Sequence, residues 1–93
     1  MQAQDTQIVS TIIDRALARN YTISVFDGEA CALGLASDKS DILGALETTD
    51  EDTLVIRNTE RHRIGSIYLV HGNEDGVIVS DYSDNAQIRE LVE

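Results

Sequence analysis

Three strand-like segments joined by two short connections constrain the fold most strongly. Residues 53–57, 63–71 and 76–82 are rich in β-branched and aromatic residues and alternate in polarity, which is typical of strands. The connections between them, "NTERH" and "GNEDG", are short and rich in turn residues. Parallel neighbours would need a crossover of about a dozen residues or more. The sequence therefore predicts a three-stranded antiparallel meander.

A hairpin is predicted ahead of the meander, within "YTISVFDGEACALGLAS". Residues 21–27 alternate at strand period, and Asp27-Gly28 suits a tight turn because glycine accepts a positive φ. The return strand, residues 30–36, is expected to place Cys31, Leu33 and Leu35 on one face. This pattern predicts that the thiol of Cys31 is buried by packing.

Three further segments have apolar residues at helical spacing and predict helices at roughly 5–19, 38–48 and 83–93. Ser83 or Asp84 is the expected cap of the last helix. Gly44 lies inside the second helix, where glycine costs up to about 1 kcal/mol relative to alanine, and this favours close packing at that position.

The predicted element order is α-β-β-α-β-β-β-α. This order predicts an α+β fold: an antiparallel sheet of about five strands, a hairpin plus a three-stranded meander, with the helices packed on one face. A chain of 93 residues is expected to form a single domain, residues 1–93. Trp is absent and Phe occurs once, so the core must be aliphatic.

The chain is strongly acidic, with 17 acidic and 7 basic residues and a net charge of −10. This charge repels nucleic acid and anionic membranes and favours a protein partner with a basic surface. It is also compatible with a role in solubility alone. We therefore expect neither direct nucleic-acid binding nor membrane binding.

One end of the meander is predicted to gather carboxylates. In an up-down-up arrangement Asp50, Glu51 and Asp52 approach Glu74 and Asp75 across the sheet end. We interpret these five residues as a candidate interaction surface, although two solvated turns would have the same composition. A calcium site is not indicated, because the D-x-[DN]-x-[DN]-G loop is absent.

The opposite end carries Arg57, Arg61, His62 and Arg63. These arginines are expected to be neutralised by three acidic neighbours, namely Glu60, Asp81 and Asp84.

Motifs for common catalytic chemistry are missing. The chain has no G-x-G-x-x-G, no P-loop pattern and no H-E-x-x-H, and its single cysteine excludes a C-x-x-C pair. We therefore expect no enzyme activity, no catalytic or metal-binding residues and no cofactor. A small ligand-binding site built from His71, Asp81 and Tyr82 is the remaining alternative, and it requires a concave pocket.

The N-terminus "MQAQDTQIVSTIIDR" has neither a basic start nor an unbroken apolar segment, and no run is long enough to span a membrane. The single cysteine indicates no disulfide framework. These features predict a cytoplasmic location in a bacterial host cell.

Four phrases carry a resemblance that covers roughly residues 11–88: "TIIDRALARNYTISVFDGE", "SDKSDILGALETTDEDTLVIR", "GSIYLVHGN" and "SDYSDNAQI". In their succession the chain resembles short acidic hypothetical proteins of bacteriophages and prophages. It departs from them after the DGE turn, where Cys31 and Gly34 replace a Trp and a basic residue. The resemblance implies a mobile-element origin and a small accessory or host-takeover protein, with no activity to carry over.

These observations predict a small phage-type accessory protein that acts by protein–protein interaction. It could inhibit a basic nucleic-acid-binding host complex by acidic mimicry. A homo-oligomeric scaffold is the alternative, because both faces of the strand at 63–71 carry apolar residues. Its self-association face would comprise Ile64, Tyr68 and Val70.

Overall fold

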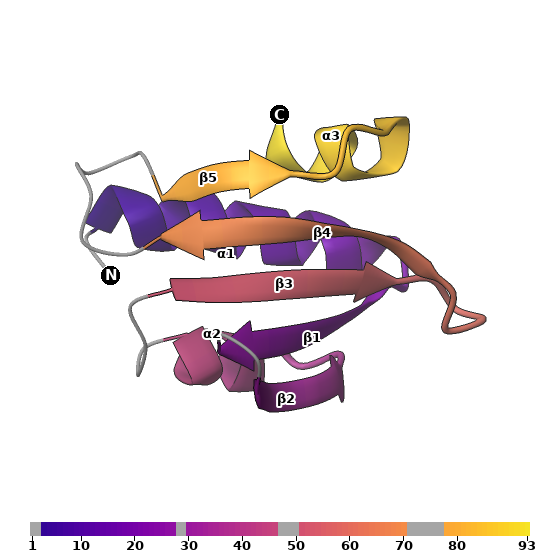
Figure 1. Cartoon of the computed structure of the whole chain (residues 1–93), viewed down its shortest axis with the longest axis horizontal. Coiled ribbons are helices and arrows are strands. Elements are labelled where there is room, and N and C mark those ends of the chain that lie inside the picture. The colour runs from indigo at the N-terminus through magenta and orange to yellow at the C-terminus, as the bar shows by residue number, and fades with distance from the viewer. Residues whose placement is uncertain (1–2, 28–29, 47–50, 71–77) are drawn as a thin grey trace.

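A computed structural model describes residues 3–27, 30–46, 51–70 and 78–93 (Figure 1). Over these ranges the chain forms three helices and five strands. In chain order they are α1 (Ala3–Ala18), β1 (Thr22–Asp27), β2 (Ala30–Ala36), α2 (Lys39–Leu46), β3 (Glu51–Arg57), β4 (Arg63–Val70), β5 (Val79–Tyr82) and α3 (Ala86–Val92). The predicted α+β class and element order are confirmed.

The strands form one five-stranded antiparallel sheet in the order β2-β1-β3-β4-β5. Strand β1 joins the hairpin to the meander by pairing with β3, where Val25 lies opposite Leu54 and Ser24 opposite Val55. The edges of the sheet are therefore β2 and β5.

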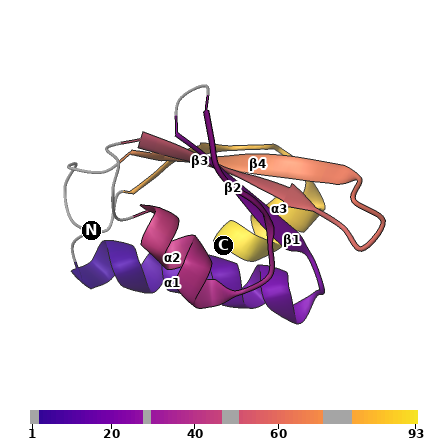
Figure 2. The same cartoon turned by 90° about the horizontal axis from the view of Figure 1, so that it is seen from below.

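All three helices lie on one face of the sheet, as Figure 2 shows. The sheet side chains that face them alternate with side chains that do not, and Ile67 and Leu69 of β4 are fully buried. The core between the layers is aliphatic, and burial of each such side chain contributes about 1.5–3 kcal/mol. Its members are Val9, Ile12, Ile13, Ala16, Ile23, Val25, Ile42, Leu46, Leu54, Ile56, Ile67, Leu69, Ile78, Ile88 and Leu91.

Asn85 caps helix α3 and also ties it to the sheet. Its side-chain Oδ1 accepts a hydrogen bond from the backbone N of Ile88 at 2.9 Å, and its Nδ2 donates to the backbone O of Ile64 at 3.1 Å. The predicted cap at Ser83 or Asp84 is wrong by one or two positions. Asn85 takes the role because its amide satisfies the helix and the strand together.

Two glycines differ sharply in their surroundings. A Cβ on Gly65 would lie 2.7 Å from Cγ1 of Ile88 and 2.9 Å from Oγ of Ser83. At Gly44 a Cβ would meet nothing within 4 Å. The close packing expected at Gly44 is therefore wrong, and among the glycines that the structure describes the crowded one is Gly65, where α3 crosses β4.

Strand β2 is irregular, and this irregularity exposes Cys31. Val25 lies opposite Leu33, whereas the next residue, Phe26, lies opposite Cys31, so β2 carries one extra residue between the two pairs. Cys31 is exposed and Leu35, with φ 46, is 41% exposed. The expectation that these residues share a buried face with Leu33 is wrong, because register shifts on both sides of the Val25–Leu33 pair break the strand alternation.

Candidate interaction face on the sheet

No helix among the described residues covers the second face of the sheet (Figure 2). Cross-strand pairing places Phe26, Thr53, Tyr68 and Asp81 side by side in a row across β1, β3, β4 and β5. Glu51 and Val70 form a neighbouring pair on the same side. We call this surface the open face, defined by Phe26, Glu51, Thr53, Tyr68, Val70 and Asp81.

Tyr68 and Glu51 are linked on the open face. The hydroxyl of Tyr68 donates a hydrogen bond to Oε2 of Glu51 at 2.7 Å. This hydrogen bond, together with partial desolvation and the negative charge of Glu51, raises the pKa of Tyr68. The phenol is therefore held as a neutral donor beside a carboxylate.

A small pocket of about 160 Å³ lies beside Tyr68, and we call it the Tyr68 pocket. It is lined by Ser66, Tyr68, Asp81, Tyr82 and Ser83. Asp81 lies directly opposite Tyr68, and its Oδ1 accepts a hydrogen bond from the backbone N of Tyr82 at 2.8 Å. Oγ of Ser83 accepts from the backbone N of Ser66 at 3.0 Å. The pocket thus combines two tyrosine side chains, a carboxylate and two serine hydroxyls.

Tyr82 reaches the helical layer as well. It lies opposite Ile67, a core residue, and its hydroxyl donates to Oε1 of Glu93 at 3.3 Å. The negative charge of Glu93, followed by desolvation and this hydrogen bond, raises the pKa of Tyr82. Two of the three tyrosines are therefore paired with glutamates.

The predicted acidic end is placed only in part. Glu51 lies opposite Val70, and the backbone N of Val70 donates to the backbone O of Ile78 at 2.9 Å, so the strand ends converge as expected. Glu51 is exposed, but Asp52 is 1% exposed. The placement of Asp52 on the acidic surface is wrong, because its side chain shares the helix-facing side with Leu54. The other three residues, Asp50, Glu74 and Asp75, lie outside the described residues.

The predicted self-association face is also split. Tyr68 and Val70 are half-buried on the open face, whereas Ile64 packs against the buried core. The reason is an irregularity between β3 and β4, where Ile56 pairs with Gly65 but Arg57 pairs with Arg63. Ile64 is the extra residue at this bulge. Ile64 therefore differs from Tyr68 and Val70 in packing against the core, and the self-association face stays a prediction.

The basic end has different partners from those expected. Nη1 of Arg57 donates to Oγ of Ser24 at 3.0 Å. Asp84 lies 3.7 Å from Nη1 of Arg89 on α3, and Glu60 lies 3.7 Å from Nδ1 of His62. The expected neutralisation of Arg57, Arg61 and Arg63 by Asp84 and Glu60 is wrong, because Asp84 pairs with Arg89 and Glu60 lies beside the His62 ring.

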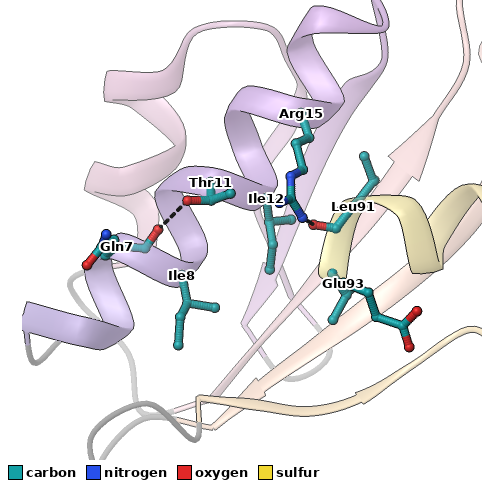
Figure 3. Close-up of a pocket in the computed structure, with 8 residues that line it drawn as sticks. Gln7, Ile8, Thr11, Ile12, Arg15, Leu91 and Glu93 are labelled. Atoms are coloured by element: carbon teal, nitrogen blue, oxygen red, sulfur yellow. Dashed lines mark hydrogen bonds between the residues drawn. The ribbon is translucent and has the colours of Figure 1, made fainter.

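A larger cavity of about 240 Å³ lies between α1 and α3 (Figure 3). Its polar groups are largely committed to the helices: Arg15 Nη1 donates to the backbone O of Leu91 at 3.2 Å, and Thr11 Oγ1 donates to the backbone O of Gln7 at 2.9 Å. Ile8 and Ile12 of α1 contribute apolar side chains to its lining (Figure 3). We therefore read this cavity as part of the helix packing.

The sequence pointed to Glu51, Tyr68 and Asp81 as candidate residues, but it did not predict that they lie close together on one face of the sheet. Phe26, Ser66 and Ser83 were missed. The alternation within β4 would have placed Ser66 beside Tyr68, whereas Phe26 joins the row only through the pairing of β1 with β3. Asp81 and Tyr82 line one pocket, as the alternative ligand site requires, while His71 lies outside the described residues.

Within the described ranges, no group of three or more His, Cys, Asp or Glu residues is arranged to hold a metal ion. No helix in the same part of the chain is long and apolar enough to cross a membrane. Comparison with protein-family models, curated proteins and solved structures finds no match to this chain. By its fold, the chain is a small α+β protein whose helices pack on one face of an antiparallel sheet, and no helix of the described ranges lies on the second face.

Proposed function

We propose that this protein is a non-catalytic interaction module that binds a protein with a basic surface through the open face. One observation carries the proposal: Tyr68 lies on the sheet face opposite the described helices, hydrogen-bonded to Glu51 and directly across from Asp81. Tyrosine is among the residues that contribute most to binding free energy at protein interfaces.

The composition of the open face supports this reading. Phe26, Tyr68 and Val70 supply half-buried apolar surface, and Glu51 and Asp81 supply exposed carboxylates beside it. Protein interfaces commonly combine aromatic residues at the centre with a polar rim. The net charge of −10 would steer a basic partner toward the chain and accelerate association at low salt.

The partner class includes proteins whose basic surface normally binds nucleic acid. In a phage or prophage setting the chain would occupy such a surface on a host complex and thereby inhibit it. The same apolar residues could instead bury against a second copy of the chain in a homo-oligomer. The experiment below distinguishes binding of a basic partner from self-association.

The test is a pull-down from bacterial lysate at low and high salt, with mass spectrometry of the retained proteins. Four proteins are compared: the natural chain, the double variant Glu51→Lys/Asp81→Lys, the control Asp41→Lys/Glu90→Lys, and Tyr68→Ala. The control makes the same charge change at exposed positions of α2 and α3. Circular dichroism confirms that each variant is folded.

We expect the natural chain and the control to retain the same basic protein at low salt. The open-face double variant and Tyr68→Ala should lose it, and high salt should weaken retention because rim charges are screened. Equal retention by all four proteins would contradict the proposal. Recovery of the chain alone, with a dimeric mass in solution that Tyr68→Ala abolishes, would replace it with the homo-oligomer.

A further inference from the structure

We infer that the Tyr68 pocket recognises an arginine side chain of the partner. The inference rests on the proposed function and specifies which chemical group of the partner the open face binds. It is argued from the size of the pocket, the charge of Asp81, the position of the Tyr68 ring and the two serine hydroxyls.

The pocket is sized for one side chain. Its volume of about 160 Å³ lies well below the roughly 300–1,000 Å³ typical of drug-sized ligand sites. Tyr68 and Asp81, which lie opposite each other on β4 and β5, both line it. A single protruding side chain of a partner protein is therefore a better fit than a free metabolite.

Asp81 supplies negative charge with spare capacity. A carboxylate offers about four lone-pair sites, and among the described residues Asp81 accepts one hydrogen bond, from the backbone N of Tyr82 at 2.8 Å. Its side chain is exposed, and the ion pairs within the described ranges use other carboxylates. Within the described residues, a partner's cation would therefore meet Asp81 without displacing an ion pair.

The Tyr68 ring supplies a surface for stacking. Its hydroxyl is held at 2.7 Å by Oε2 of Glu51 on β3, the neighbour of β4 on the side away from Asp81, and the Tyr68 side chain lines the pocket together with Asp81. A cation over the face of a tyrosine ring is attracted by the ring quadrupole. Glu51 adds a second negative charge at the far end of the same ring.

The serine hydroxyls favour arginine over lysine. Oγ of Ser83 already accepts one hydrogen bond, from the backbone N of Ser66 at 3.0 Å, and retains a second lone pair. A guanidinium is planar, stacks on aromatic rings and carries five donors in a fixed geometry, whereas an ammonium is a compact point charge. A stacked guanidinium can satisfy Asp81 and a serine oxygen together.

The test is an NMR titration of the ¹⁵N-labelled chain with the peptide acetyl-Gly-Arg-Gly-amide. The comparison peptides replace arginine with lysine or with citrulline, which keeps the shape of arginine but is neutral. The variants are Asp81→Asn, Tyr68→Leu and the control Asp41→Asn, an exposed aspartate in the helical layer. The amide spectrum of each variant reports that it is folded.

We expect saturable shifts at residues 66–68 and 81–83, with affinity in the order arginine, lysine, citrulline. Asp81→Asn should weaken arginine-peptide binding by about tenfold, since a charge-assisted hydrogen bond is lost, and Asp41→Asn should leave it unchanged. Tyr68→Leu should reduce the preference for arginine over lysine. Equal shifts with citrulline, no saturation, or undiminished binding by Asp81→Asn would overturn the inference.

The two proposals fail separately. If the arginine peptide binds the pocket but the lysate yields no partner that depends on the open face, the inference stands and the proposed function fails. If a basic protein is retained through the open face and Asp81→Asn retains it equally well, the proposed function stands and the arginine assignment fails.

Discussion

The hydroxyl of Tyr68 on β4 lies 2.7 Å from Oε2 of Glu51 on β3, and this bond raises the pKa of the phenol above its ordinary value of 10.0. The folded chain therefore holds this proton more tightly than the unfolded chain does. The resulting stabilisation is fully present below the unfolded pKa and is lost as the pH rises through the folded pKa.

We expect Glu51→Gln to lower the pKa of Tyr68, because a neutral amide oxygen accepts a weaker hydrogen bond from the phenol than a carboxylate does and the opposing negative charge is removed. Ultraviolet absorbance of tyrosinate measures the titration, and subtraction of the Tyr68→Phe curve isolates this residue. Glu93→Gln, which acts at Tyr82, is the matched control and should leave the Tyr68 pKa unchanged. An unaltered Tyr68 titration in Glu51→Gln would refute the assigned cause.

Gly65→Ala should destabilise the protein by about 1–3 kcal/mol, because the added methyl overlaps Ile88 and Ser83 where α3 crosses β4. The midpoint of urea unfolding followed by circular dichroism measures the change. A variant as stable as the natural chain would show that α3 is not seated against β4 as described.

Gly44→Ala is the matched substitution, and it should change the free energy of unfolding in the opposite direction. Nothing lies within 4 Å of the new Cβ, and alanine has a higher helix propensity than glycine. We expect stabilisation of up to about 1 kcal/mol in the same urea experiment. Destabilisation would instead indicate that Gly44 is crowded.

Asn85→Ala should cost about 1–2 kcal/mol, since it removes both the cap of α3 and the donor to the backbone O of Ile64. Asn85→Asp keeps an oxygen for Ile88 but has no amide donor, so its stability should fall between those of the alanine variant and the natural chain. Equal stability of the two variants would contradict the expectation that both hydrogen bonds of Asn85 contribute, because it would show that only the bond to Ile64 matters.

Cys31 should react with a thiol reagent in the folded state at a rate close to that in urea, because it lies exposed on the irregular edge strand β2. Cys31→Ser should change the free energy of unfolding by no more than about 0.5 kcal/mol. Strong protection of the thiol in the folded protein would show that β2 follows the regular alternation instead.

Local patterns in the sequence determined the elements and most of the core. The apolar spacing of residues 8–17 indicated the buried side of α1, and the alternation of Ile67 and Leu69 with Tyr68 indicated the two faces of β4. The short connections required antiparallel neighbours. These inferences held because helical and strand periodicity act over a few residues and are set by burial of one face.

Tertiary structure alone decided the site. The pairing of β1 with β3 brings Phe26 into line with Thr53, and the pairing of β4 with β5 sets Asp81 opposite Tyr68. Asp52 turns inward because β3 extends its alternation two residues earlier than the apolar run indicated. Strand pairing and bulges depend on contacts distant in sequence, so no local pattern encodes them, whereas helix and strand periodicity can be read directly from neighbouring residues.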